Sequence, residues 1–325
     1  MKLPLLLIGF VVIASVHELK GRLGKNGSGM KKRKTWASAV FTTNVSGSRN
    51  PNCKWLKGAK HQFQMCNKKK GLDAVLMQAR DLAVQSCREN FRYKQWDCSN
   101  TSLYFQKNYR ETALMTSISA SALVYAIARA CATGQLRLCK CAAHGKSPNE
   151  TEWQWGGCGD NIKFARKFTR SFLQLKKKRD EGVNLEKHNS RIGIDVVVGK
   201  EEKHCKCHGI SGSCSMKICW KRLRPFSEIS QVLRDEYHSA TVPPNSTALQ
   251  KKYRKLLYVD IGPDLCPLTS GRRCSDIPNC VTLCCVRGYY TKQVPKMYVC
   301  NCKMFSNLYP SCENCTTQET VYICK

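Results

Sequence analysis

The chain is 325 residues long, contains 22 cysteines and carries a formal net charge of +31 at pH 7. This length suits one large domain or two modest ones, and so dense and even a set of cysteines makes disulfides the main constraint on the fold. In a cytosolic protein the charge would favour nucleic acid as a partner, but the amino-terminal stretch excludes that compartment and with it that class of function.

Residues 1–19 are predicted to be a secretory signal peptide. Lys2 is followed by an apolar run from Leu5 to Ala14, and Ala14 and Ser15 are small residues suited to cleavage. The run is too short to span a membrane. Secretion places the cysteines in an oxidising compartment, so they are expected to form disulfides rather than bind metal or act as redox groups.

Lysine and arginine are concentrated in short runs, at 31–34, 68–70, 176–179 and 251–255. Outside the cell, the acidic polymers that such a surface meets are sulfated glycosaminoglycans. We therefore expect the protein to bind heparan sulfate at the cell surface and in the matrix, with an affinity that falls as salt rises. The alternative is that these charges are only solvated, mutually repelling faces.

The chain contains six motifs for N-linked glycosylation, which agree with passage through the secretory pathway. Such motifs also occur by chance, so we expect only some of them to be occupied. The candidate sites are Asn44, Asn100, Asn149 and Asn245, and the other two motifs are at Asn26 and Asn314.

Apolar periodicity predicts a mainly helical amino-terminal part. Residues 20–52 are basic, rich in Gly, Ser and Asn and without an apolar period, so they are expected to be a flexible arm. A further helix should start at a capping Asp160 or Asn161. His188 and Asn189 are expected to pack within their helix rather than to catalyse. The spacing of apolar residues predicts the other helices over 72–87, 109–130, 185–198 and 225–237.

The predicted helix over 109–130 is unusual because residues 113–128 carry no charge. A membrane span is one interpretation, but the uncharged stretch is short and contains four serines or threonines. A buried central helix, which its neighbours approach closely through small residues, is the favoured interpretation. Gly134 suits the carboxyl-terminal cap of this helix.

Four cysteines enclose a small loop between Cys205 and Cys219. Nested pairing of Cys205 with Cys219 and of Cys207 with Cys214 would make a doubly stapled hairpin. The loop residues around Ser211 are His208, Gly209, Ile210, Gly212 and Ser213. The two glycines allow the positive φ angles of a tight turn and leave no side chain beside Ser211, so its hydroxyl should stand clear of the loop.

This loop resembles the signature of the Wnt family of secreted, lipid-modified signalling glycoproteins. Two more segments resemble motifs of that family. One is Cys87–Cys98, which contains Phe-x-x-x-x-Trp-Asp-Cys, and the other is the Trp-rich run over Trp153–Asn161. The resemblance covers about residues 53–325, and the text of Ala128–Cys131 and Pro225–Ala240 is most similar to the ninth Wnt subgroup. It implies that Ser211 carries a monounsaturated fatty acyl ester.

The fold implied is disulfide-rich α+β. We expect a helical amino-terminal domain over 53–242 that carries the acyl-bearing hairpin, a linker over 243–255, and a small cysteine-rich β-hairpin domain over 256–325. Twelve cysteines precede the linker and ten follow it, which suits two separately stapled domains. The carboxyl-terminal piece is too small to bury a sufficient core, so disulfides should replace one.

The disulfide pairing follows from spacing only in part. Cys53 with Cys66 and Cys87 with Cys98 close short loops, although sequence alone proves no pairing. The resemblance implies the remaining pairs, which are Cys131–Cys139, Cys141–Cys158, Cys205–Cys219, Cys207–Cys214, Cys266–Cys285, Cys274–Cys280, Cys284–Cys324, Cys300–Cys315 and Cys302–Cys312.

The second stapled hairpin departs from the family at its tip, over 303–311. Most members have Trp-Cys-Cys where this chain has Ser306, Asn307 and Leu308, although the loop length is kept. The tip stays apolar, and an exposed apolar tip is usually a contact surface. Its predicted receptor-contact residues are Met304, Phe305, Leu308 and Tyr309.

The resemblance implies a ligand of a Frizzled receptor. The acyl chain on Ser211 would fill an apolar groove of the Frizzled cysteine-rich domain, the 303–311 tip would grip its opposite side, and a low-density-lipoprotein-receptor-related co-receptor would be recruited. A membrane-bound acyltransferase of the endoplasmic reticulum and a dedicated Wnt carrier would act during secretion. No cofactor, no catalytic residue and no nucleic-acid partner is expected.

Three alternatives compete with the ligand. In a hydrolase, His208 and Ser211 would be base and nucleophile, but Ser213 breaks the G-x-S-x-G pattern and no acid in the loop orients the histidine. In a zinc knuckle, the Cys-x-Cys-His run of Cys205, Cys207 and His208 would bind metal together with Cys214 and Cys219. A matrix component bound by charge alone would explain the lysines but not the stapled serine loop.

Overall fold

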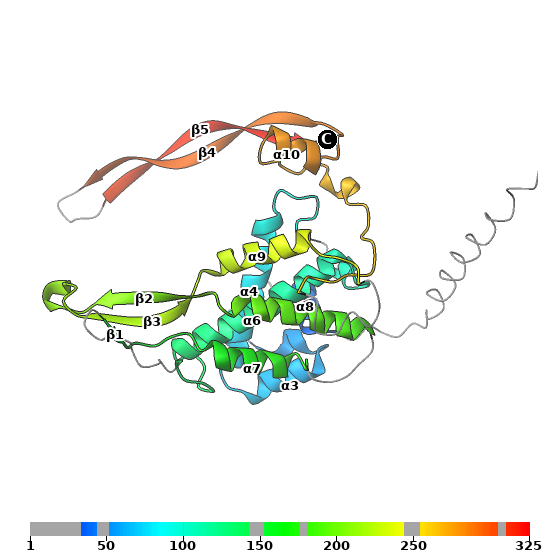
Figure 1. Cartoon of the computed structure of the whole chain (residues 1–325). Coiled ribbons are helices and arrows are strands. Elements are labelled where there is room, and N and C mark those ends of the chain that lie inside the picture. Colours follow the sequence, from blue (N-terminus) through cyan, green and yellow to red (C-terminus); the bar gives the residue numbers. More distant parts are fainter. Residues whose placement is uncertain are drawn as a thin grey trace, which may run out of the picture. The chain divides into compact units, whose positions relative to one another are not determined.

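The computed structural model describes residues 34–43, 52–99, 101–142, 153–175, 181–243, 254–304 and 310–325. The fold is a disulfide-rich α+β arrangement with a mainly helical core and two β-hairpins (Figure 1). The helices are α2 (Trp36–Thr42), α3 (Lys60–Lys68), α4 (Leu72–Phe91), α5 (Thr101–Tyr104), α6 (Arg110–Ala132), α7 (Ile162–Phe172), α8 (Glu181–Val197), α9 (Phe226–His238) and α10 (Ile277–Leu283). The strands are β1 (Gln154–Trp155), β2 (Glu201–Cys207), β3 (Lys217–Leu223), β4 (Tyr289–Met304) and β5 (Pro310–Cys324).

Helix α6 is the centre of the helical core, and α2, α4, α7, α8 and α9 all pack against it. It is the one helix in the described part of the chain that is long and apolar enough to cross a membrane, but 89% of that stretch is buried inside the fold. A side chain at Gly193 of α8 would collide with the backbone of Ser117, so the two helices touch through small residues. The prediction of a buried central helix is confirmed.

Helix α2 corrects the expectation of a flexible arm over 20–52. Thr35 caps this helix in a reciprocal arrangement with Ser38. The Trp36 ring is buried between Trp55 and Phe172, and its Nε1 donates a hydrogen bond to the Ser119 carbonyl at 3.0 Å. Seven residues are too few for a readable period, so contacts with distant residues decide their structure. The rest of the arm lies outside the described residues, apart from Lys34, Thr43 and Asn52.

His188 and Asn189 fasten α8 to the chain that follows α9. His188 Nε2 lies 2.9 Å from the Lys255 carbonyl oxygen. The Asn189 side chain donates to the Leu257 carbonyl and accepts from the Leu257 amide, both at 2.9 Å. The structure therefore uses both residues for packing, as predicted. Most of the predicted 243–255 linker, over 244–253, lies outside the described residues.

The two β-hairpins belong to separate sheets. Strands β1, β3 and β2 form a three-stranded sheet in that order, with β1 parallel to β3 and β2 antiparallel to it. Strands β4 and β5 form a long two-stranded ribbon whose register shifts between Cys300 and Lys303. A small second core of Cys274, Cys280, Leu283, Cys284 and Cys324 lies at the base of that ribbon.

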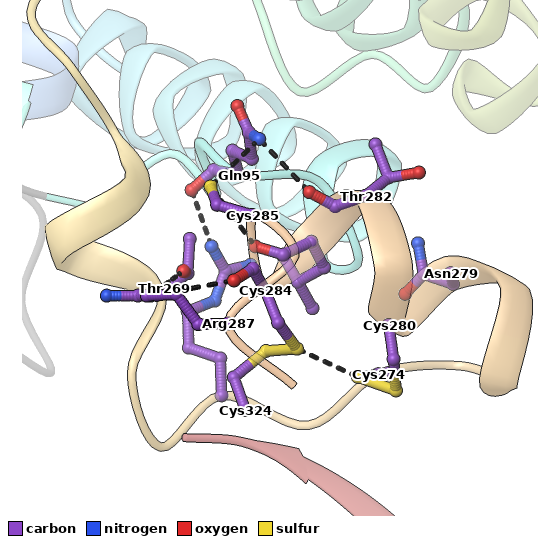
Figure 2. The surroundings of a disulfide bond; sticks show 12 residues. Gln95, Thr269, Cys274, Asn279, Cys280, Thr282, Cys284, Cys285, Arg287 and Cys324 are labelled. Carbon is purple, nitrogen blue, oxygen red and sulfur yellow. Dashed lines mark hydrogen bonds between the residues drawn. A yellow bond between two sulfur atoms is a disulfide. The ribbon is translucent and has the colours of Figure 1, made fainter. Parts of the chain in front are cut away.

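All 22 cysteines are paired, in eleven disulfides that join the partners expected from spacing and from the resemblance together. Two of them meet in the second core, where the Cys274 and Cys284 sulfurs are 3.6 Å apart (Figure 2). Because so few apolar residues are buried there, disulfides take the place of a conventional core.

The cysteine-rich part docks on the loop between Cys87 and Cys98. Arg272 donates hydrogen bonds to the Gln95 carbonyl at 2.6 Å and to the Arg92 carbonyl at 2.9 Å. The Gln95 side chain in turn donates to the Thr282 carbonyl at 3.0 Å (Figure 2). This contact is polar, in contrast to the apolar packing around α6.

Candidate acylation loop and its supporting hairpin

The candidate site lies at the end of the β2–β3 hairpin. Cys205 is directly opposite Cys219 in the strand register, and the two are joined by a disulfide. Cys207 and Cys214 form a second disulfide across the loop itself. Two cross-links within one short hairpin leave the loop little freedom to rearrange.

Backbone hydrogen bonds close the loop between its two ends. The His208 amide donates to the Met216 carbonyl at 2.7 Å, and the Gly209 amide donates to the Ser213 carbonyl at 2.8 Å. The Gly212 amide donates back to the Gly209 carbonyl at 3.0 Å. These bonds turn residues 210–212 into a single tight helical turn.

The two glycines of the loop are required for different physical reasons. Gly212 has φ of +77°, as predicted for a tight turn. Gly209 has φ of −72°, so the predicted positive angle is wrong for this residue. A side chain there would collide with the Ser213 and Ser215 hydroxyls and lie 2.6 Å from the Ser213 carbonyl oxygen. Gly209 is needed for space, whereas Gly212 is needed for conformation.

Ser211 stands at the apex of the turn and is exposed. Its φ of +55° lies in the left-handed region, which a non-glycine residue adopts at an energetic cost. Its hydroxyl makes no hydrogen bond to any other residue that the structure describes. The neighbouring Ile210 side chain is 91% exposed, and Ser213 and Ser215 bond to each other instead. The serine hydroxyl is therefore open to an enzyme that would modify it.

The loop lacks the parts of a serine hydrolase. His208 is exposed, and within the described residues it has neither a carboxylate partner nor a hydrogen bond to Ser211. A nucleophilic serine requires a base that a third group orients. The zinc-knuckle interpretation is wrong, because the four cysteines of the loop are in disulfides and leave no thiolate for a metal.

Aromatic residues surround the base of the hairpin. The Trp153 and Trp155 rings meet edge to face at 4.7 Å, and Lys203 Nζ lies 4.3 Å from the centre of the Trp153 ring. A side chain at Gly157, whose φ is +69°, would come 3.0 Å from the Trp220 ring. The glycines of the Trp-rich run thus make room for β3 to lie beside β1.

Asp160 anchors the hairpin to the helical core, a role that sequence reasoning missed. It is 1% exposed, and its carboxylate accepts from the Leu223 amide at 2.7 Å and faces Arg129 of α6 at 3.4 Å. Its own amide donates to the Lys221 carbonyl at 3.1 Å. Asn161 caps α7, accepting from the Phe164 amide at 2.9 Å. The position next to a cap was the only signal for Asp160 in the sequence.

The second candidate contact, at the end of the β4–β5 ribbon, is described only in part. Met304 ends β4 and is 69% exposed, whereas Phe305, Leu308 and Tyr309 lie outside the described residues. Disulfides Cys300–Cys315 and Cys302–Cys312 staple the ribbon close to this end. The candidate glycosylation sites Asn44, Asn100, Asn149 and Asn245 also lie outside the described residues.

The fold and the loop define a class of protein: disulfide-rich and α+β, with a helical core that supports two stapled hairpins. The sequence model described as the wnt family matches residues 54–325, and this chain therefore belongs to the Wnt family. Members of that family are secreted signalling ligands of developmental pathways.

The chain is similar to several individual Wnt proteins. It is 36% identical to Wnt-4 of Drosophila melanogaster over 315 residues, which is 88% of this chain and 58% of that longer protein. It is 35% identical to Wnt-9b of Mus musculus over 310 residues, covering 86% of each. Wnt-9a of Gallus gallus is 33% identical over 304 residues, or 84% of this chain and 86% of that one.

The fold is also that of a solved Wnt structure. A chain from the structure of human WLS in complex with WNT8A superposes with a TM-score of 0.58. The match covers 90% of this chain and 100% of the other, at 24% sequence identity. At this level of identity, the likeness shows that the two chains share a fold.

Proposed function

We propose that this protein is a secreted Wnt-type ligand that binds the cysteine-rich domain of a Frizzled receptor through a monounsaturated fatty acyl chain on Ser211. The observation that carries the proposal is the exposed, unpartnered Ser211 hydroxyl at the apex of a doubly stapled loop. The family's acyl-bearing serine occupies this position in the same loop text. The protein acts by binding and not by catalysis, and it needs no cofactor.

The β4–β5 tip supplies the second contact with the receptor. A single acyl chain holds a protein to a membrane only marginally, with an association constant of about 10⁴ M⁻¹, so its transfer into a receptor groove is feasible. Two contacts on one ligand reinforce each other because binding of the first raises the effective concentration of the second. A low-density-lipoprotein-receptor-related co-receptor then joins the Frizzled, and activation of Wnt signalling follows.

The other partners belong to secretion and to the extracellular space. An acyltransferase of the endoplasmic reticulum esterifies Ser211, and a membrane carrier takes the acylated protein to the cell surface. The likeness to a chain in complex with WLS supports the carrier, at the level of the fold. Heparan sulfate retains the secreted protein in the matrix, in keeping with the net charge of +31.

The direct test is the mass of the tryptic peptide that contains Ser211, from secreted protein, before and after mild ester cleavage. We expect an unsaturated acyl adduct that cleavage removes. Ser211→Ala should abolish the adduct and weaken Frizzled binding at least tenfold while all eleven disulfides form. Ser213→Ala is the matched control, because it keeps the acceptor serine. Signalling that survives Ser211→Ala at full strength would refute the mechanism.

A further inference from the structure

The two faces of the β4–β5 ribbon differ in charge. Opposite residues in an antiparallel pair point to the same face, and successive residues alternate. The register therefore places Lys292, Lys296, Glu313 and Glu319 together on one face. The other face has no charged residue. Its members are Tyr289, Thr291, Gln293, Pro295, Met297 and Val299 of β4, and Asn314, Thr316, Gln318, Thr320, Tyr322 and Cys324 of β5.

This uncharged face is unusual in so charged a chain. Charged residues make up 24% of the sequence, so twelve residues would hold about three of them on average. At the base of the ribbon, Tyr289 and Tyr322 pack against the second core. Beyond Tyr322 every residue of the face is exposed, and Met297 and Val299 are 69% and 64% exposed. Apolar side chains left bare in this way mark a contact surface or a risk of aggregation.

The same face carries a motif for N-linked glycosylation. Asn314, Cys315 and Thr316 form the pattern Asn-x-Thr, and Asn314 is the one acceptor of the six motifs that falls within the described part of the chain. Asn314 is opposite Val299, and Thr316 is opposite Met297. The acceptor therefore lies beside the exposed apolar pair. Its carboxamide and the Thr316 hydroxyl are exposed and form no side-chain hydrogen bond with a residue that the structure describes.

The middle residue of the motif does not obstruct this face. Cys315 is opposite Tyr298, and its partner Cys300 is opposite Glu313, so the disulfide between them lies on the charged face. This disulfide fixes β5 to β4 next to Asn314. The space above the Asn314 carboxamide remains open.

We propose that Asn314 carries an N-linked oligosaccharide that covers the uncharged face of the ribbon. The donor is an oligosaccharide linked to a lipid diphosphate in the secretory pathway. A bond forms between the carboxamide nitrogen and the first sugar carbon as the bond from that carbon to the diphosphate oxygen breaks. The nitrogen loses one proton and the lipid diphosphate leaves. This modification goes beyond the proposed function and does not depend on Ser211.

The glycan has a physical role at this place. Two copies of a protein with a net charge of +31 repel each other, except where they can meet through surfaces without charge. The uncharged face is such a surface, and burial of Met297 and Val299 against a second copy would be favourable. An oligosaccharide on Asn314 fills the space beside them with bulky, hydrated groups. It therefore keeps the ribbon soluble.

The first measurement is the mass of the tryptic peptide Met304–Lys325 from the secreted full-length protein, before and after treatment with an amidase that removes N-linked glycans. This peptide contains one glycosylation motif. We expect it to carry an oligosaccharide and Asn314 to be converted to aspartate when the glycan is removed. An unmodified Asn314 in the secreted protein would overturn the proposal.

A pair of variants at Thr316 tests the role of the glycan. Thr316→Ala removes the hydroxyl that the motif requires, and Thr316→Ser is the matched control because serine keeps the motif. Thr316→Ala should lose the glycan and raise the self-association constant about tenfold, because the apolar pair is uncovered. Thr316→Ser should keep both the glycan and the wild-type constant. The measurement is sedimentation velocity at physiological salt, with both variants acylated so that the acyl chain contributes equally.

Met297→Thr with Val299→Thr, added to Thr316→Ala, should return self-association to the wild-type value. A variant without the glycan that associates no more than the wild type would overturn the covering role. The changed side chains are exposed, and disulfide mapping checks that the fold is intact. The peptide mass of the wild type decides the presence of the glycan even where a variant is not secreted.

The same digest separates this proposal from the proposed function, because Ser211 lies in another peptide. An acylated Ser211 with an unmodified Asn314 would refute the glycan alone. A glycosylated Asn314 with an unmodified Ser211 would support the glycan and refute the acyl mechanism alone.

Discussion

Single residues shape the proposed acylation loop, residues 208–213, through two different constraints. Gly209 is required because the Ser213 and Ser215 hydroxyls fill the space beside its Cα, and Gly212 because its φ is positive. Ser211 has a left-handed backbone conformation, and the Cys207–Cys214 disulfide, which closes the loop around it, keeps the backbone in that conformation. The proposed acylation site therefore depends on residues that would not touch the acyl group themselves.

His188 makes stability depend on pH. Burial lowers its pKa below the ordinary value, against an opposing effect of its bond to the Lys255 carbonyl. The unfolded chain, with a pKa of about 6.5, then takes up a proton before the folded chain does. This contribution to stability is complete above about pH 6.5 and is lost as the pH falls through the folded pKa.

We therefore expect the free energy of unfolding to fall as the pH drops below about 6.5, and His188→Gln to make that fall shallower. The measurement is guanidinium unfolding followed by tryptophan fluorescence. His208→Gln, which changes an exposed histidine, is the control and should keep the wild-type pH dependence. Identical curves for wild type and His188→Gln would show that His188 does not contribute.

At the level of elements, the cysteine-rich part is held to the helical part by polar contacts to backbone. The loop between Cys87 and Cys98 offers carbonyl groups that Arg272 and Asn279 bond, and Asp97 lies 3.6 Å from Arg272 Nε. Burial lowers the pKa of Arg272, an effect that Asp97 opposes. Contacts of this kind give the interface a defined geometry without a large apolar area.

Arg272→Gln should reduce the free energy of unfolding by about 2–3 kcal/mol, because two backbone carbonyls lose a charged donor. Faster hydrogen exchange over residues 92–98 should accompany this loss. Arg273→Gln is the matched control, since Arg273 only pairs with Glu319 on the exposed ribbon, and it should cost less than about 1 kcal/mol. Equal effects of the two changes would show that Arg272 does not hold the interface.

At the level of the whole molecule, the proposed receptor contacts lie on two hairpins that different disulfides stiffen. The proposed acylation loop is cross-linked by Cys205–Cys219 and Cys207–Cys214, and the end of the β4–β5 ribbon by Cys300–Cys315 and Cys302–Cys312. Rigid hairpins lose little entropy on binding, which favours affinity from small contacts.

The ribbon offers a direct comparison of tip and stalk. Met304 and Met297 are both on β4 and both 69% exposed, but only Met304 lies at the end of the strand. Met304→Asp should weaken binding to an isolated Frizzled cysteine-rich domain about tenfold or more, by placing a charge in an apolar contact. Met297→Asp should leave that affinity unchanged. The measurement is surface binding of both acylated variants, and equal affinities would remove Met304 from the contact.

The sequence by itself determined the features that depend on neighbours in the chain. The apolar period predicted α4, α6 and α9, and the text of the Cys205–Cys219 loop carried the family and the exposed serine. Local spacing is sufficient for such features because the groups involved are close before the chain folds. The disulfides follow this rule only in part, because spacing indicated short-range pairs such as Cys53–Cys66, whereas a pair such as Cys284–Cys324, 40 residues apart, was implied by the family resemblance.

Only the tertiary structure decided the features that join distant parts of the chain. Helix α2 exists because Trp36 is buried against residues more than 80 positions away. Asp160 holds the hairpin to the helical core because β3 passes beside it and Leu223 donates to its carboxylate. Arg272 holds the cysteine-rich part because the 87–98 loop presents the Gln95 carbonyl to it. How much each of these polar groups stabilises the fold depends on its burial and on its hydrogen-bond partner. Both come from distant parts of the chain, so no local sequence pattern reveals them.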